Sequence, residues 1–255
     1  MTTPIVMVHG AFCAGWAFDH FRLPFEAAGH AVIAPDLPGH ECGPGRPTVA
    51  GRSMSDYARA VRRIIDDQPS PPIVIGHSMG GLVAQMAATR SSVAGLILLA
   101  PSCPWGISGS TTEEAISAVS LYALGPYWAL PVDPDYTSAQ RYLFDRLGRA
   151  EGREAFARLT PESGRALWET LNWWLDPFAT THVGAGAIRA RVLAIAGELD
   201  AIHPPATVRS ISSRLGGETQ VFPGMSHWLV GEPGWERVAA ACLKWIDQNQ
   251  SDEAA

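Results

Sequence analysis

The feature that most constrains the fold is the alternation of short apolar runs with helical patterns along the first hundred residues. The apolar runs are Ile5–Val8, Ala31–Ala34, Ile73–Ile75 and Val93–Ala100. Helical patterns separate them at residues 14–28, 53–67 and 79–90. Strands that are apolar throughout and alternate with helices are typical of a parallel sheet covered on both faces. The sequence therefore predicts an α/β fold.

The alternation stops at Pro101 and resumes at Arg191. Residues 102–187 show helical patterns and no convincing strand, whereas residues 191–196 and 219–222 are again strand-like and residues 233–248 form a closing helix pattern. We therefore predict a core made of residues 1–101 and 188–255, with a mostly parallel sheet of about six strands flanked by helices. A helical cap of residues 102–187 interrupts this core.

Composition excludes several classes of protein. Hydrophobic residues make up 47% and charged residues 17%, which favours a large buried core over a disordered chain. A net charge of −6 lacks the basic surface that nucleic acids require. The longest apolar stretch, near residues 93–100, is far shorter than the ~20 residues of a membrane span. With no secretory signal pattern at the start, we expect a cytoplasmic protein with neither a nucleic acid nor a membrane as partner.

Cysteine and lysine usage limits the chemistry further. The four cysteines, Cys13, Cys42, Cys103 and Cys242, form no CxxC pair, which argues against a zinc site and a disulfide framework. The single lysine, Lys244, lies in the closing helix pattern, which argues against Schiff-base catalysis. We therefore expect no metal and no organic cofactor.

A candidate nucleophile lies between a predicted strand and a predicted helix. Residues 76–80, Gly-His-Ser-Met-Gly, match G-x-S-x-G, a pattern that is weak by itself because chance gives a match in roughly one chain in six of this composition. Its position gives it weight, because a serine on a sharp strand-to-helix turn exposes its hydroxyl above the sheet edge. The alternative is a glycine-rich turn that only packs the helix on the strand. We predict Ser78 as the nucleophile.

A serine hydroxyl needs a base, and the base needs a group that orients it. His227 follows the strand pattern of residues 219–222, and Asp200 follows that of residues 191–196. Both positions are carboxyl ends of parallel strands, where catalytic groups gather. We predict His227 as the base and Asp200 as the acid, with Glu198 and Asp176 as rivals for the acid. His9 is interpreted as a brace for the loop after the first strand.

Five motifs in order carry a family resemblance: residues 8–10, 34–40, 76–81, 197–200 and 224–227. With them the chain resembles the α/β-hydrolase superfamily over essentially its whole length. In that family, the residue after the first His-Gly pair and the residue after the serine donate backbone N–H groups to the oxyanion. The resemblance implies that Ala11 and Met79 form this oxyanion hole.

Residues 8–16, Val-His-Gly-Ala-Phe-Cys-Ala-Gly-Trp, resemble the group of plant methylesterases and hydroxynitrile lyases. The lyases carry a threonine and a lysine where this chain has Gly10 and Trp228, which argues against a lyase. The resemblance implies a serine hydrolase that cleaves a carboxylic ester, lactone or thioester through an acyl-enzyme. Carbon–carbon bond hydrolases and cofactor-free perhydrolases share the same triad and stay open, as does a non-catalytic small-molecule receptor.

The predicted substrate is a small molecule of apolar or aromatic character, because 12 of the 22 aromatic residues fall within residues 102–187. The alternative is a small helical layer that uses aromatic side chains for its own packing. We expect a monomer or homodimer. The predicted substrate contacts are Phe12, His77, Trp128, Trp173, Trp174 and Trp228.

Overall fold

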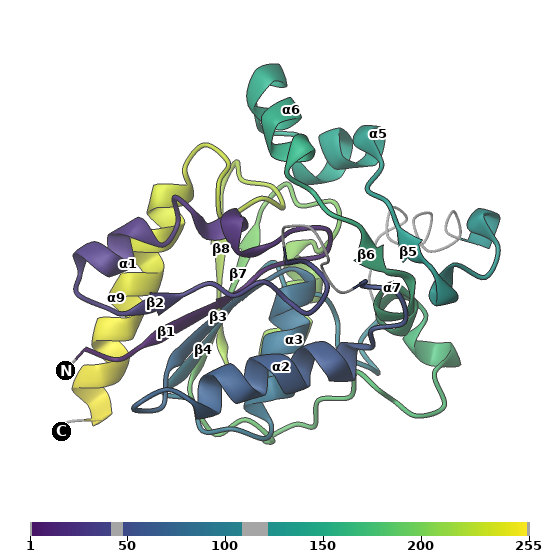
Figure 1. Cartoon of the computed structure of the whole chain (residues 1–255). Coiled ribbons are helices and arrows are strands. Elements are labelled where there is room, and N and C mark those ends of the chain that lie inside the picture. Colours follow the sequence, from purple (N-terminus) through teal and green to yellow (C-terminus); the bar gives the residue numbers. More distant parts are fainter. Residues whose placement is uncertain (1, 42–47, 109–121, 254–255) are drawn as a thin grey trace.

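The computed structural model describes residues 2–41, 48–108 and 122–253, and in them one parallel sheet forms the centre of the fold (Figure 1). Its six strands lie in the order β2-β1-β3-β4-β7-β8, and every neighbouring pair is parallel. The strands are β1 (Ile5–Val8), β2 (Val32–Ile33), β3 (Ile73–His77), β4 (Gly95–Leu99), β7 (Val192–Gly197) and β8 (Glu218–Phe222). This confirms the predicted fold class and the number of strands.

Successive strand residues point to opposite faces of a sheet, so each face has its own apolar core. Val6, Val74 and Leu96 lie in one core, beneath α2 (Met54–Asp66), α3 (Met79–Ala88) and α8 (Pro205–Leu215). Their neighbours Ile5, Ile73 and Ile97 lie in the other, beneath α1 (Leu23–Ala27) and α9 (Trp235–Glu253). The continuous apolar strands of the sequence are therefore explained by burial on both faces.

Helix ends follow the local chemistry. Helix α2 begins with the capping box of Ser53 and Asp56, each side chain bonding the other's backbone N–H. The single helix predicted over residues 14–28 is wrong: a 3₁₀ turn, η1 (Gly15–Phe18), comes first, and α1 starts separately with Pro24 in its first turn. Proline is suited to a first turn and interrupts a continuous helix because it has no N–H to donate.

The segment between β4 and β7, residues 102–187, is called the insertion below. Its described elements are η2 (Tyr122–Leu124), η3 (Tyr127–Ala129), β5 (Pro131–Val132), α5 (Tyr136–Ser138), the π-helical η4 (Ala139–Leu143), α6 (Arg149–Ala157), β6 (Glu162–Ser163), α7 (Gly164–Leu171) and η5 (Trp173–Leu175). Residues 109–121 of the predicted cap lie outside the described residues. In Figure 1 these elements gather at one side of the sheet, and α7 packs against α2.

The expectation of an insertion without strands is wrong in one detail. β5 and β6 pair antiparallel, with Pro131 opposite Ser163 and Val132 opposite Glu162. Two residues are too short a run for an alternating pattern to show in a sequence. No helix in the described residues is both long enough and apolar enough to cross a membrane.

Candidate active site

Ser78 lies on the sharp turn between β3 and α3, with backbone angles φ +53° and ψ −125°. A non-glycine residue in such a conformation is strained, and the surrounding backbone must hold it. Ser78 N donates to Leu99 O at 2.9 Å, and Ser78 O accepts from Ser102 N at 3.0 Å. A Cβ atom on Gly80 would lie 2.2 Å from Val8 O. The glycine after Met79 is therefore required for α3 to begin directly against β1.

The three residues predicted as a triad meet at the carboxyl ends of their strands. His227 Nε2 lies 2.9 Å from Ser78 Oγ, and His227 Nδ1 lies 2.8 Å from Asp200 Oδ2. Asp200 follows β7 and His227 follows β8. A hydroxyl in contact with an imidazole, itself held by a carboxylate, is the arrangement that activates a serine nucleophile.

Asp200 is held in its ionised form. Burial alone would raise its pKa, but the neighbouring charge of His227, its hydrogen bond and the His203 amide lower that pKa to about 2. Asp200 Oδ1 accepts from Ile202 N at 2.8 Å and from His203 N at 2.9 Å, leaving Oδ2 for the imidazole. The carboxylate is therefore fixed in position and charge.

The rival acids lie elsewhere. Glu198 is exposed, and its Oε2 accepts from Gly224 N at 2.9 Å. Asp176 accepts from the amides of Phe178 and Thr180 in its own turn. Of the three carboxylates, Asp200 is the one that bonds the His227 ring.

Two more histidines surround His227. His77 Nε2 lies 2.9 Å from His227 O, and its ring centroid lies 5.1 Å from that of His227. His203 Nδ1 lies 2.9 Å from Ala100 O. Burial lowers the pKa of His77 to about 3 and that of His203 to about 4, so both stay neutral at pH 7. His77 was predicted as a substrate contact, but the structure buries it as a support for the His227 backbone.

The loop after β1 lies against the nucleophile. A Cβ atom on Gly10 would lie 3.0 Å from Ser78 Cβ, which shows how closely the two segments approach. His9 Nε2 accepts from Leu37 N at 2.9 Å, so the proton of the neutral ring is on Nδ1, which donates to Gly10 O at 2.9 Å. Burial lowers the pKa of His9 to about 3. His9 thus occupies the bracing position predicted for it.

The two predicted oxyanion donors flank Ser78. Met79 is the first residue of α3, and N–H groups of a first turn have no acceptor within their helix. Ala11 follows Gly10 in the loop that touches Ser78. Within the described chain, neither amide donates to another protein group. An N–H group without a protein acceptor is what the predicted oxyanion role requires.

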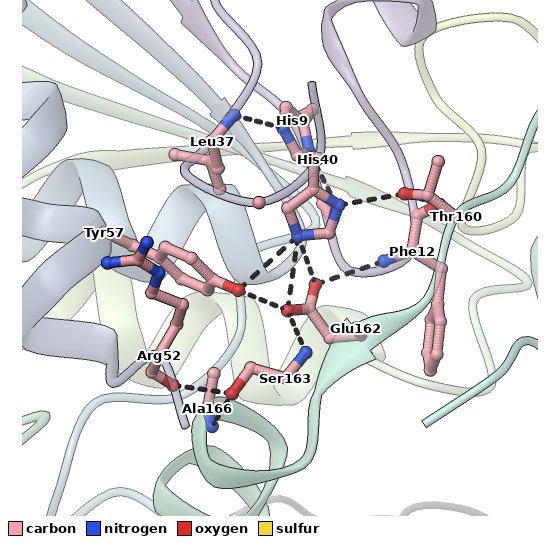
Figure 2. A network of polar contacts seen from close by, with 12 residues as sticks. His9, Phe12, Leu37, His40, Arg52, Tyr57, Thr160, Glu162, Ser163 and Ala166 are labelled. Atoms are coloured by element: carbon pink, nitrogen blue, oxygen red, sulfur yellow. Dashed lines mark hydrogen bonds and ion pairs between the residues drawn. The ribbon is translucent and has the colours of Figure 1, made fainter. Parts of the chain in front are cut away.

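A residue that no sequence motif singles out also reaches this loop. Glu162, in β6 of the insertion, accepts from Phe12 N at 3.2 Å (Figure 2). Its side chain is fully buried. The contact joins positions 150 residues apart and belongs to no motif, so only the folded chain reveals it.

The aromatic residues predicted as substrate contacts lie in different parts of the structure. Trp228 is buried in the core, with its ring 5.2 Å from that of Phe144. Trp173 packs on Trp105, whereas Trp174 is exposed. The described residues leave a cavity of about 510 Å³ within the insertion, lined among others by Tyr122, Trp128, Trp168 and Phe178. No triad residue lines that cavity.

The thiol of Cys13, in the loop after β1 (called the oxyanion loop below for its predicted role), offers no second nucleophile. Cys13 is buried, and burial raises its pKa well above the ordinary range of a thiol, so it stays protonated. Cys242 is likewise buried, and Cys42 lies outside the described residues. Among the described side chains, no group of three His, Cys, Asp or Glu residues is placed to hold a metal ion.

A family model described as "Alpha/beta hydrolase family" matches residues 5–241. The chain belongs to the alpha/beta hydrolase family. This confirms the resemblance carried by the five motifs.

Relatives of this hydrolase match along nearly all of its length. It is 26% identical to a monoacylglycerol lipase of Mycolicibacterium smegmatis over 95% of this chain and 87% of that protein. It is 29% identical to a pimeloyl-[acyl-carrier protein] methyl ester esterase of Chromobacterium violaceum over 94% of each. A methylesterase structure from Arabidopsis superposes with a TM-score of 0.72 at 16% identity, covering 96% of this chain and 99% of that one. The family and these relatives support ester hydrolysis.

Proposed function

We propose that this protein is a serine hydrolase that cleaves a carboxylic ester through an acyl-enzyme formed on Ser78. The observation that carries the proposal is the continuous contact from Ser78 Oγ through the His227 ring to Asp200, at 2.9 Å and 2.8 Å. Each atom in this series is of the type that the reaction requires: a nucleophile, a base and a carboxylate.

In the first half of the reaction, His227 takes the proton from Ser78 Oγ as that oxygen attacks the ester carbonyl. The negative charge that develops on the carbonyl oxygen is stabilised by the N–H groups of Ala11 and Met79. His227 then returns its proton to the leaving alcohol, and the acyl group stays on Ser78. In the second half, His227 activates a water that releases the acid.

The substrate class follows from the family and the insertion. The relatives are named as a lipase and a methyl ester esterase, and both names describe carboxylic esters. The insertion also holds 12 of the 22 aromatic residues of the chain. We infer a small ester with an apolar or aromatic part, a class that includes lactones and thioesters of the same shape.

The test is covalent labelling. Wild-type protein is treated with a fluorophosphonate and, separately, with p-nitrophenyl esters of short to long acyl chains, and intact mass is recorded. We expect one phosphonyl adduct and a transient acyl adduct on Ser78. Folded wild-type protein that gains neither adduct would contradict the proposal and favour a non-catalytic receptor.

Ser78→Ala is the matched variant for this test. It should keep the wild-type circular dichroism spectrum, lose both adducts and lower kcat by roughly 10⁴–10⁶-fold. Activity above about a tenth of wild type would place the nucleophile on another residue.

A further inference from the structure

The two peptide groups on either side of the Ala11 Cα are each held by a side chain. Gly10 O accepts from His9 Nδ1 at 2.9 Å. Because a trans peptide is planar, this bond directs the Ala11 N–H to the opposite side. The next peptide is held by Glu162, which accepts from Phe12 N at 3.2 Å. The bond from His9 comes from the core, and the bond to Glu162 comes from the insertion.

Glu162 makes this contact as the centre of a buried network (Figure 2). Besides Phe12 N, its oxygens face Tyr57 Oη at 2.7 Å, Ser163 N at 2.7 Å and His40 Nε2 at 3.3 Å. Burial acts to raise the pKa of Glu162, but the charge of His40 and the hydrogen bonds from His40, Tyr57 and Ser163 bring the pKa below its ordinary value. Glu162 is therefore a carboxylate, which only accepts hydrogen bonds.

Phe12 itself needs this support. Its φ is +63°, a strained value for a residue with a side chain. The insertion binds both polar atoms of its backbone: Glu162 accepts from Phe12 N, and Thr160 N donates to Phe12 O at 2.8 Å. His40 Nδ1 lies 3.0 Å from Thr160 Oγ1, so the same histidine contacts both residues that hold Phe12.

We propose that Glu162 is a positioning residue for the oxyanion hole: its carboxylate holds the Ala11–Phe12 peptide and so prevents rotation about the Ala11 Cα, which keeps the preceding Gly10–Ala11 peptide, held by His9, with its N–H in a fixed direction. The inference rests on the proposed function, in which that N–H stabilises charge on the substrate oxygen. The charge is present in the transition state and absent from the bound ester, so the contribution of Glu162 belongs to kcat and not to KM.

The test is Glu162→Gln, measured with a p-nitrophenyl ester. The amide is nearly isosteric, but it replaces one acceptor oxygen by a donor amid the Phe12, Ser163 and Tyr57 donors. We expect kcat to fall at least tenfold while KM stays within about twofold, since losing a whole oxyanion donor costs about 10²–10³-fold. The rate of fluorophosphonate labelling should fall in parallel, and the final labelled fraction should stay complete.

The matched control is Glu169→Gln. Glu169 is also a buried carboxylate of the insertion that binds core backbone, accepting from Met54 N at 2.8 Å and from Arg165 Nε at 2.9 Å, but it does not contact the oxyanion loop. Its kcat should stay within about twofold of wild type. If Glu169→Gln lowers kcat as much as Glu162→Gln does, the effect is general loosening of the insertion and the inference is wrong.

A Glu162→Gln kcat within twofold of wild type, or a loss confined to KM, overturns the inference. If Glu162→Gln does not fold, Glu162→Asp is compared with Glu169→Asp; the shorter acid keeps the charge among its donors but withdraws from Phe12, and the same kcat loss is expected. A wild-type protein that is never labelled would instead contradict the proposed function, which separates the two failures.

Discussion

The tautomers around Ser78 follow from the partners of each ring. Asp200 Oδ2 only accepts, so His227 Nδ1 carries the proton and Nε2 is left as the base toward Ser78 Oγ. In His9, the amide of Leu37 donates to Nε2 and the assignment is the same. Backbone and carboxylate partners thus decide where the protons lie before any substrate binds.

Asp200→Asn tests this assignment. The amide can donate to Nδ1 and stabilise the wrong tautomer, so we expect kcat to fall by about 10³–10⁴-fold with the fold retained. Steady-state kinetics together with a circular dichroism melt measure both properties. Glu198→Gln is the control, because Glu198 is exposed and bonds Gly224 N away from the ring. A larger loss in the Glu198 variant would show that the acid is misassigned.

Strand order predicted where the candidate residues meet, because carboxyl ends of parallel strands share one edge of the sheet, but it did not decide between Asp200 and Glu198, which follow the same strand. Ser78, Asp200 and His227 each follow a strand, and the structure brings them together. Glu162 could not be found in this way, since its partner Phe12 is reached through packing of the insertion. Aromatic composition could not show which tryptophans lie where. Trp228 and Trp174 are the same residue type, but Trp228 is buried and Trp174 is exposed.

At the scale of elements, α3 starts in direct contact with the backbone of β1. A Cβ on Gly80 would lie 2.2 Å from Val8 O and 2.3 Å from His9 O, and neither carbonyl can move without disturbing β1 or the loop after it. The junction that exposes Ser78 therefore also fixes the spacing between helix and sheet.

Gly80→Ala should destabilise the protein by about 3 kcal/mol or more, because the added methyl group meets rigid backbone. Urea unfolding followed by tryptophan fluorescence measures this change. Gly152→Ala in α6 is the comparison: its Cβ would meet the end of the Gln140 side chain, which can move away. We expect that variant to be neutral or stabilised by up to about 1 kcal/mol. Equal losses in both variants would refute the explanation.

Element boundaries were predictable where capping chemistry is local and poorly predictable elsewhere. The helical pattern predicted from residue 53 begins where the structure has the Ser53 and Asp56 capping box of α2. Helix α8 was not predicted, because its residues 205–215 are rich in serine and arginine and show a weak apolar stripe, although Gly216 ends it in the left-handed conformation at φ +68°. Packing on the sheet, and not local sequence, decides its presence.

For the molecule as a whole, the buried carboxyl group of Glu232 makes stability depend on pH. Glu232 is buried, and its Oε1 accepts from Ser226 N at 2.6 Å, next to His227 in the chain. Within the described residues, its Oε2 has no hydrogen-bond partner. Burial raises the pKa of Glu232 to about 7; the Ser226 amide opposes this shift, Asp145 adds to it, and the charges of His227 and Arg146 oppose it.

In the unfolded chain a glutamate titrates near pH ~4.3. Between that pH and about 7 the folded protein therefore holds a proton on Glu232 that the unfolded chain has lost. The contribution of Glu232 to the free energy of unfolding must then fall as pH rises through this window, and it levels off above it.

Glu232→Gln removes this titration while keeping an acceptor for Ser226 N. We expect the unfolding free energy of wild type, measured relative to the variant, to be higher at pH 5 than at pH 8. Parallel urea titrations of both proteins at four pH values give the difference directly. A difference that is constant, or that grows with pH, would contradict the raised pKa.

The hydrogen bonds between the insertion and the Phe12 backbone limit how this enzyme can be re-engineered by recombination. A chimera that takes residues 102–187 from a related hydrolase keeps Ser78, Asp200 and His227 but discards both partners of the Phe12 backbone, Thr160 and Glu162. We expect such a chimera to change its substrate selectivity and to lose kcat as well, because the Phe12 backbone is no longer held. Designers who want a new substrate range at the original rate should place the crossovers so that residues 160–163 are inherited along with His40 and Tyr57.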